Sequence, residues 1–332
     1  QHVSVKKADA KLLKRVAKIY AERLDPNETL LTEAEYQKLE ARLGVLVNQV
    51  KDRKCADFAQ LKKDQVAWQK DLEDYVRKTV SDKKFKIDKK RVVDLDPKKR
   101  ARPKNNKEQA KLRRAFIDFQ MANYVAGDVD MKEAKQKLIH RHELFTRRVK
   151  EQTEADLFGV FLNAYAAAHD PHSTYFSMED MEDFRIQMQL SLQGIGAVLT
   201  SRDGFTTVEE VVAGGAADEQ GQLKPKDQII AVTQGVKGDA VDVIDMNLRD
   251  VVRLIRGKKG TKVTLTVLRK AEKTERLTFT ITRDKIDLAE SAAKLEWRDV
   301  KRGKKTLKVA VIDLPSFYMG DKPGARDSAQ DV

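Results

Sequence analysis

The spacing of apolar residues changes once along the chain, and this change limits the fold more than any other feature. From residue 8 to about residue 170, apolar side chains recur every three or four positions, as Leu12, Val16 and Ile19 illustrate. After about residue 188, glycines cluster and β-branched residues alternate with polar ones. The first period favours amphipathic helices and the second favours half-buried strands. The sequence therefore predicts a multidomain α+β chain, all-helical at first and β-rich afterwards.

Two local signals mark helix starts in the first part. Thr32 is followed three residues later by Glu35, and Asn105 is followed at the same distance by Glu108. A short polar side chain with a glutamate three positions on is typical of a helix N-terminus. We therefore expect helices to begin at both places, and the last helix to end near Asp170.

Residues 83–104, which we call the basic segment, concentrate the positive charge. The segment holds eleven Lys and Arg residues against three Asp residues, a net +8 of the +13 carried by the whole chain. Two prolines and many like charges favour a loop or an extended, solvated arm. Such an arm could contact an anionic surface. Specific nucleic-acid binding is not expected, because Phe85 alone is available there for base stacking.

The β-rich part contains one short helical pattern among its strands. Residues 246–256 follow a helical spacing and end at Gly257, a residue that favours a helix stop. Alternation at Val263, Leu265 and Val267, and again over residues 277–281, indicates half-buried strands. Strands around one helix predict a small, partly open β-barrel.

A last strand is predicted from Leu307 to Leu314. Apolar residues occur on both of its faces, which is typical of a buried central strand. A buried strand needs a sheet around it, so we expect a third domain to begin here.

The most informative motif is the run Gly194-Ile195-Gly196-Ala197. A free C-terminal carboxylate needs several backbone N–H donors that converge on one point, and glycine lets the backbone curl toward a ligand. The strand that starts at Gly196 can then pair with a peptide tail by β-addition. A tight turn without a ligand is the alternative for the motif alone.

The pocket for the apolar residues of the tail is expected from four side chains. They are Ile195 in the loop and Val251, Val252 and Ile255 on the short helix. The sequence leaves the register of this helix undecided by one position, so the helix residues that face the groove are not fixed.

The order of the motifs resembles a bacterial PDZ module. Its stretches are Ser191–Leu199, Val211–Ala217, Leu223–Val232 and Asn247–Gly257. Two positions depart from the pattern, since Lys226 stands where the module usually has glycine and Ala216 replaces the common proline. Both departures concern turns rather than the groove.

The resemblance extends to tail-specific, C-terminal processing serine peptidases. Asp170–Phe176 resembles the segment that introduces their PDZ module, and Leu24–Pro26 with the following Leu30 and Leu31 is similar to their N-terminal helical domain. Val309–Tyr318 resembles the strand that opens their protease core. The resemblance implies three parts: a helical domain over 1–188, a PDZ domain over 189–286, and the incomplete start of the peptidase core over 287–332.

In this family a neutral lysine takes the proton of a serine, which then attacks the scissile carbonyl. The resemblance implies that the serine, the lysine and the Gly-rich oxyanion segment lie downstream of the opening strand, beyond Val332. Ser316 and Ser328 stand in the wrong context. We therefore assign no catalytic residue, metal or cofactor, and expect the chain to bind tails without cutting them.

The resemblance also implies partners and a compartment. The partners are the C-terminal tails of protein substrates, with an adaptor protein docking on the helical domain. The compartment is the periplasm of the cell envelope, with a signal peptide already removed, and no transmembrane segment is visible. The alternative function is a stand-alone, non-catalytic PDZ adaptor or scaffold.

A few polar residues carry weaker signals. His169, Asp170, His172 and Ser173 contain the ingredients of a hydrolase triad or a metal site, but adjacent residues favour a structural turn. His140 and His142 stand two apart on a helix, so they should point in different directions. Cys55 has no partner for a disulfide and is expected to be a small buried hydrophobe.

Overall fold

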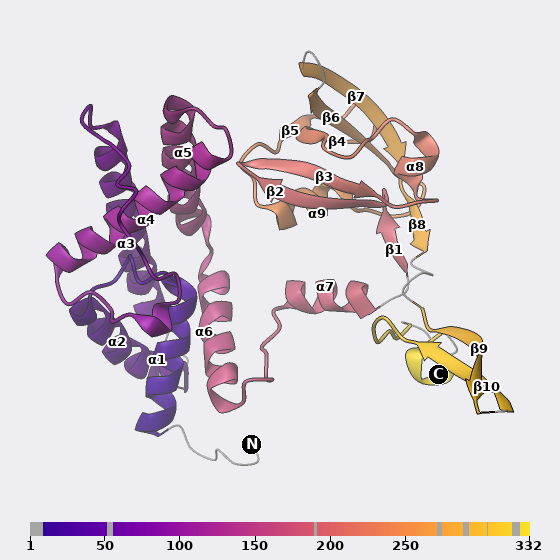
Figure 1. Ribbon diagram of the computed structural model, residues 1–332, viewed down its shortest axis with the longest axis horizontal. Helices are drawn as coiled ribbons and strands as arrows, with labels where there is room; N and C mark the ends of the chain where they lie inside the picture. The colour runs from indigo at the N-terminus through magenta and orange to yellow at the C-terminus, as the bar shows by residue number, and fades with distance from the viewer. Residues whose placement is uncertain are drawn as a thin grey trace. The chain divides into compact units, whose positions relative to one another are not determined.

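The computed structural model describes residues 9–51, 56–188, 191–270, 274–287, 292–303, 305–320 and 326–332 (Figure 1). The chain divides into two compact units between Ser177 and Met178. The first is helical and the second is mostly β, so the predicted multidomain α+β class is confirmed. The three domain ranges expected from the sequence stay a prediction, and Cys55 lies outside the described residues.

The helices of the first unit follow one another through short connections. They are α1 (Ala10–Leu24), α2 (Glu33–Lys51), α3 (Ala56–Ser81), α4 (Asn106–Ala126), α5 (Met131–Glu151) and α6 (Glu154–His169), with a 3-10 turn η1 (Pro97–Lys99) between α3 and α4. Both predicted helix starts are confirmed. The hydroxyl of Thr32 accepts from Glu35 N while Glu35 accepts from Thr32 N at 2.7 Å, and Asn105 accepts from Glu108 N at 3.0 Å.

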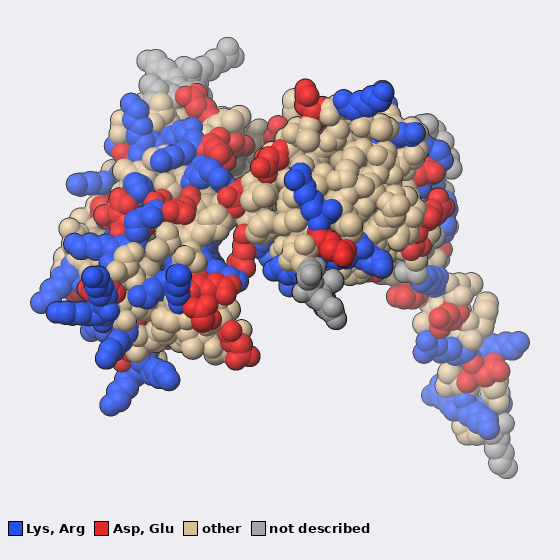
Figure 2. All heavy atoms as spheres, turned by 90° about the horizontal axis from the view of Figure 1, so that it is seen from above, with Lys and Arg blue, Asp and Glu red and all other residues tan. Residues whose placement is uncertain are grey.

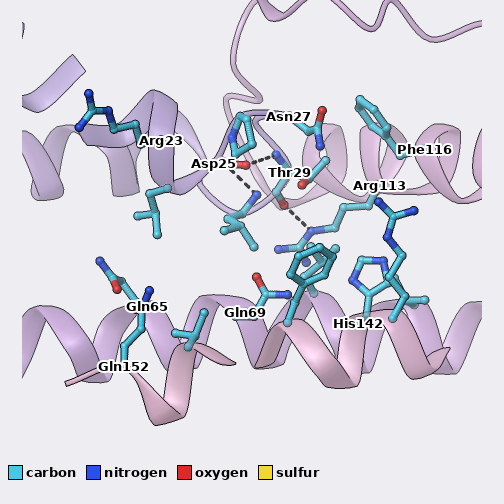
Figure 3. Close-up of a pocket in the computed structure, with 18 of the residues that line it drawn as sticks. Arg23, Asp25, Asn27, Thr29, Gln65, Gln69, Arg113, Phe116, His142 and Gln152 are labelled. Carbon is cyan, nitrogen blue, oxygen red and sulfur yellow. Dashed lines mark hydrogen bonds between the residues drawn. The ribbon is translucent and has the colours of Figure 1, made fainter. Parts of the chain in front are cut away.

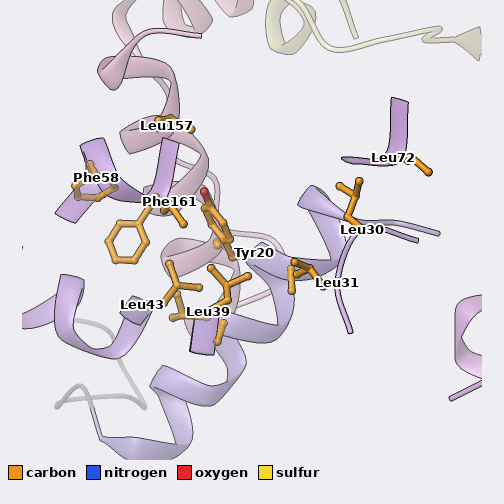
Figure 4. Packing of buried hydrophobic residues seen from close by; sticks show 14 of the residues in the cluster. Tyr20, Leu30, Leu31, Leu39, Leu43, Phe58, Leu72, Leu157 and Phe161 are labelled. Atoms are coloured by element: carbon orange, nitrogen blue, oxygen red, sulfur yellow. The ribbon is translucent and has the colours of Figure 1, made fainter. Parts of the chain in front are cut away.

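The core of this unit is aliphatic with a few aromatic rings (Figure 4). Phe58 of α3 and Phe161 of α6 meet edge to face, with ring centroids 5.5 Å apart. Tyr20 of α1 is fully buried, and its hydroxyl accepts from Gln65 Nε2. Burial raises the pKa of Tyr20, so the phenol stays protonated. These contacts join α1, α3 and α6 around one hydrophobic cluster.

The link between α1 and α2 is organised by the carboxylate of Asp25, which is buried (Figure 3). It accepts from the backbone N–H groups of Thr29, Leu30 and Leu31 at 2.8, 3.0 and 3.0 Å. Burial raises the pKa of Asp25, while these hydrogen bonds and Arg102 oppose the rise. The Leu24–Pro26 motif thus begins a turn whose donors converge on one carboxylate.

The basic segment is held against this turn by Arg102. Its guanidinium pairs with Asp25 and Glu28 at 3.3 Å each and lies 4.9 Å from the centroid of the Tyr36 ring. The side chain of Arg102 is only 10% exposed. An arginine that is both paired and stacked fixes the backbone on either side of it.

Two neighbours extend the same attachment. Arg100 donates to Asn27 O at 2.6 Å and lies over the Phe116 ring, and Pro103 O accepts from Glu33 N at 2.8 Å. The segment is a loop, as predicted, but the expectation of an extended, solvated arm is corrected for its C-terminal end, because Arg100 and Arg102 bind the turn after α1 and lie over the rings of Phe116 and Tyr36. The lysines of the segment all stay exposed.

The second unit begins with α7 (Met178–Met188) and continues with strands and two short helices. The strands are β1 (Ser191–Gly194), β2 (Ala197–Arg202), β3 (Phe205–Val211), β4 (Gln228–Gln234), β5 (Ala240–Asp242), β6 (Lys262–Lys270), β7 (Thr274–Thr282) and β8 (Asp284–Asp287), and the helices are α8 (Ala216–Gln220) and α9 (Leu248–Ile255). The main sheet has the order β2-β3-β4-β6-β7, with β5 on β4, and β1 pairs with β8. All these pairs are antiparallel.

The predicted strands at 263–267 and 277–281 are present as β6 and β7, but β6 is buried on both faces. Thr264 and Thr266 form the polar face of β6. Their hydroxyls meet those of Thr280 and Thr278 on β7 at 2.7 and 3.3 Å. Hydroxyl pairs across the strands let polar residues occupy a buried face, which alternation alone does not reveal.

The last part forms a two-stranded ribbon, β9 (Lys294–Arg302) with β10 (Lys305–Asp313), followed by the short helix α10 (Ser328–Asp331). The prediction of a buried central strand is wrong for β10 as described, since Val309 and Ile312 are 38% and 47% exposed. Within the described residues, β9 is the only strand that pairs with β10. Its apolar faces therefore lack cover.

The surface carries both signs of charge. On the face that Figure 2 shows, Lys and Arg side chains lie among Asp and Glu side chains over both units. None of the described helices combines the length and the apolar character that crossing a membrane requires.

Candidate functional site

The β2 strand leaves one of its edges open. Within the described residues it pairs only with β3, and α9 packs beside β2 and β4 (Figure 1). Val198 on β2 is 46% exposed. An unpaired strand edge offers alternate N–H and C=O groups to another extended chain. The edge of β2 and the adjacent α9, which together we call the groove, have the chemistry to pair with an extended peptide.

At the start of β2, two amide groups point away from α8 and from the end of β3. Ile195 O accepts from Ala217 N at 2.7 Å, and Gly196 O accepts from Val212 N at 2.9 Å. In a trans peptide the C=O and the next N–H point in opposite directions. The N–H groups of Gly196 and Ala197 are therefore directed away from α8 and β3. Two adjacent donors with this orientation suit an anion such as a carboxylate.

Glycine is required in this loop on two counts. Gly196 has a φ of +73°, in the left-handed region, and a Cβ there would lie 3.1 Å from the Cα of Gly215. A Cβ on Gly215 would in turn lie 3.2 Å from the Cα of Gly196 and 2.9 Å from Val212 O. The two loops approach closely because neither carries a side chain. The Gly-X-Gly motif and the Gly214-Gly215 pair are thus parts of one contact.

The apolar residues predicted to line the pocket divide into two groups. Ile195, Val251 and Ile255 are buried in the hydrophobic cluster of this unit, whereas Val252 is half-buried. Leu248, four residues before Val252, is also half-buried. Residues four apart share one face of a helix. Leu248 was missed by the sequence reasoning, although its spacing from Val252 is a signal that could have found it.

The C-terminal end of α9 is capped by a buried arginine from the end of β7. Arg283 is 3% exposed and donates to Ile255 O at 2.7 Å and to Leu254 O at 3.0 Å. Burial lowers its pKa. The predicted helix stop is present, but Gly257 has another reason to be glycine, since a Cβ there would lie 2.8 Å from Arg283 Nε. Sequence reasoning missed Arg283 because the two carbonyls that it caps lie 28 and 29 residues earlier in the chain.

A second support for α9 comes from α7, which is acidic. Arg249 pairs with Asp180 at 2.6 Å and with Asp183 at 3.0 Å, and Arg256 pairs with Asp183 at 3.4 Å. These side chains are roughly a third to a half exposed, so each pair contributes modestly. Together they hold α7 along the helix of the groove.

The polar residues between His169 and Ser173, at the end of α6, form a turn. Asp170 caps α6 and accepts from Ser173 Oγ at 3.1 Å, and His172 Nδ1 lies 3.2 Å from the same carboxylate. Serine and histidine thus share one acceptor instead of forming a relay from serine through histidine to aspartate. His140 is half-exposed and His142 is buried, in line with their different directions on α5.

Comparisons with known proteins match both units of the chain. The family model described as the tail-specific protease N-terminal domain matches residues 1–179, and a PDZ domain model matches residues 183–268. A tail-specific protease of Haemophilus influenzae is 36% identical over 228 residues, which cover 69% of this chain and 32% of that protein. The carboxy-terminal processing protease CtpA of Bacillus subtilis is 36% identical over 132 residues, which cover 39% of this chain and 27% of that protein.

Two solved structures are also similar. The PDZ domain of a carboxy-terminal protease from Vibrio cholerae, solved in complex with a peptide, is 48% identical, covers 30% of this chain and all of that chain, and gives a TM-score of 0.29. The photosystem II D1 C-terminal processing protease is 18% identical over 52% of this chain and 45% of that chain, with a TM-score of 0.30.

The chain spans about a third of the length of the curated relatives that it matches. The N-terminal domain model covers more than half of the chain, and the PDZ model follows it directly. The chain therefore belongs to the tail-specific, C-terminal processing protease family, of which it carries the helical N-terminal domain and a PDZ domain.

Proposed function

We propose that the groove between β2 and α9 binds the free C-terminal tails of protein substrates, and that this chain is the substrate-recognition portion of a serine endopeptidase. The observation that carries the proposal is that β2 pairs only with β3 among the described residues, beside two N–H groups, those of Gly196 and Ala197, that are directed away from α8 and β3. The curated relatives are named as tail-specific or carboxy-terminal processing proteases, which supports the same function.

The proposed binding mode follows from the groove. The tail adds as an extended strand to β2, and its carboxylate accepts from the two amide groups. Its terminal apolar side chain packs on Leu248 and Val252, two half-buried residues that share one face of α9. Main-chain pairing supplies affinity, and the contacts with these side chains supply selectivity.

Cleavage belongs, in this proposal, to a serine and a lysine of the peptidase core, which act on the substrate that the groove selects. The periplasm is the proposed compartment, on the family resemblance. Docking of an adaptor on the helical unit and contact of the basic segment with an anionic surface stay predictions.

The test compares peptides that share one apolar sequence and differ only at the C-terminus, which is free or amidated. We expect amidation to weaken binding by about 1–3 kcal/mol, because it removes charge-assisted hydrogen bonds. Fluorescence anisotropy with the whole chain measures both affinities. Equal affinity for the two peptides would refute carboxylate recognition.

A pair of variants locates the site. Val252→Asp places a charge in the proposed pocket and should abolish binding of the free-tail peptide. Val300→Asp is the matched control, because Val300 is 45% exposed on the ribbon strand β9. Equal loss in both variants would count against the groove.

A further inference from the structure

The helical unit contains a cavity that the proposed function does not use. Its volume is about 490 Å³, within the usual range of small-molecule sites. It lies among α1, α3, α4, α5 and α6 and the turn after α1, so its wall comes from one compact unit. Figure 3 shows Arg113 reaching in from one wall and Gln69 and His142 from the opposite wall.

Much of the wall is apolar. Leu72 and Val76 of α3, Phe116 of α4, Phe145 of α5 and Leu157 of α6 line the cavity. Phe145 is 41% exposed, whereas the other four are buried. An apolar cavity that is more exposed on the side of Phe145 suits a ligand that buries a hydrocarbon chain.

A buried arginine in the wall lacks one hydrogen-bond partner. Arg113 is 4% exposed, and its Nε donates to Thr29 O at 2.7 Å and its Nη1 to Asp71 at 2.7 Å. Its Nη2 has no acceptor among the described residues. A buried donor without an acceptor is unfavourable, and a guanidinium donor is best satisfied by an anionic oxygen.

A buried histidine shows the same deficit. His142 is 9% exposed, and its Nδ1 has no partner among the described residues. Burial, together with the charge of Arg141, lowers the pKa of His142 to about 4, so the ring is neutral at pH 7. A neutral imidazole is free to present an N–H to a ligand oxygen.

The charge around the cavity has one predominant sign. Arg23, Arg113 and Arg141 line it, whereas Asp25 is the single acid among the described lining residues. The carboxylate of Asp25 is already occupied by three backbone N–H groups and Arg102. The cavity therefore attracts an anion more than a cation.

From these contacts we propose that the cavity binds a small amphiphilic carboxylate, whose head accepts from Arg113 and His142 and whose alkyl chain packs on the apolar wall. The site is separate from the tail groove, because every lining residue belongs to the helical unit. The ligand class is that of a medium-chain alkyl carboxylate. The inference does not depend on tail binding.

The test uses three probes with the same ten-carbon chain: decanoate, decan-1-ol and decyltrimethylammonium. Isothermal titration into the whole chain should give one decanoate per chain, at least about tenfold tighter than the other two probes. The tenfold ratio corresponds to about 1.4 kcal/mol for the head-group contacts. Equal affinity for decanoate and decyltrimethylammonium, or no decanoate binding, would overturn the proposal.

Variants connect the binding to the cavity. Val149→Trp fills the lined space and should remove decanoate binding, whereas Val125→Trp, at a 41% exposed position on α4 outside the lining, should retain it. Arg113→Gln should weaken decanoate at least tenfold and leave decan-1-ol unchanged. If Arg113→Gln does not fold, the two tryptophan variants still decide. Wild-type affinity in Val149→Trp would refute the site.

Discussion

At the residue scale, Lys226 carries a backbone conformation that favours glycine. Its φ is +74°, and its N–H donates to Val208 O at 2.7 Å. The turn is fixed on its other side by Asp227, which is 1% exposed and accepts from Arg269 Nε at 2.8 Å. The surrounding hydrogen bonds thus hold a non-glycine residue in the left-handed region, at a cost of about 1 kcal/mol.

We expect Lys226→Gly to raise the free energy of unfolding of the second unit by up to about 0.5 kcal/mol, because the strain relieved at the left-handed residue slightly exceeds the entropy that glycine adds to the unfolded chain. Urea denaturation of the whole chain measures it. Lys224→Gly, in the same turn but without positive φ, is the control and should be neutral or destabilising. A loss of stability in Lys226→Gly would contradict the strain.

The departure at Lys226 was visible in the sequence, because the motif names the position where glycine is usual. The sequence did not show that the backbone at Lys226 keeps the glycine conformation with lysine in place, which the structure shows. The other departure, Ala216, is the first residue of α8, a position that does not need proline but accommodates it.

At the element scale, α9 is positioned from its two sides by Arg283 and by α7. Arg283 donates to the carbonyls that end the helix, and α7 contributes aspartates to Arg249 and Arg256. The buried arginine matters more, because leaving carbonyls without donors inside the protein costs more than losing exposed ion pairs. The orientation of the groove helix therefore depends mainly on Arg283.

Arg283→Met should destabilise the second unit by about 1–3 kcal/mol and weaken tail binding at temperatures where the unit is still folded. The reason is that Ile255 O loses the guanidinium donor, whereas Leu254 O keeps Gln234 Nε2 and Lys262 O keeps Gly235 N. Thermal denaturation and peptide titration measure the two effects. Arg276→Met, at an exposed position of β7, is the matched control. Unchanged stability in Arg283→Met would show that the cap is dispensable.

The elements themselves were largely predictable, because helical and alternating periods follow from which face is buried. Val263, Leu265 and Val267 indicated β6 correctly, and Thr32 with Glu35 marked the start of α2. The spacing of apolar residues does not show which neighbouring element covers the polar face of a strand. For that reason the burial of Thr264 and Thr266 was missed, and so was the exposure of β10.

At the scale of the whole molecule, each unit has its own hydrophobic cluster. One runs from Leu12 to Ala168 and the other from Ile195 to Ile286. A separate core lets a unit unfold on its own. The two proposed ligands would also bind different units, so their stabilising effects should be separable.

We expect differential scanning calorimetry to resolve two transitions. A free-tail peptide at one hundred times its Kd should stabilise one of them by about 2.7 kcal/mol, and decanoate at the same ratio should stabilise the other. The amidated peptide and decyltrimethylammonium serve as matched controls. If both ligands shift the same transition, the assignment of the two sites to different units is wrong.

The sequence indicated the two-part character and the groove loop, because both depend on local patterns. It did not reveal the ion pairs that connect distant segments, such as Arg102 with Asp25 across 77 residues. The charge of the basic segment suggested a solvated arm, since charge counts carry no information on which partner each arginine meets. The cavity could not be predicted either, because its wall comes from segments that lie far apart in the sequence.

The touching glycines of the two loops have a consequence for engineering. Gly196 and Gly215 are each already the smallest residue, and each blocks any growth of the other. A library that aims to change which tails are captured should therefore leave both untouched, since no compensating swap exists between them. Sequence diversity is better placed on the helix side, at Leu248 and Val252, where a bulkier or smaller residue alters the proposed pocket without moving the backbone of the proposed carboxylate site.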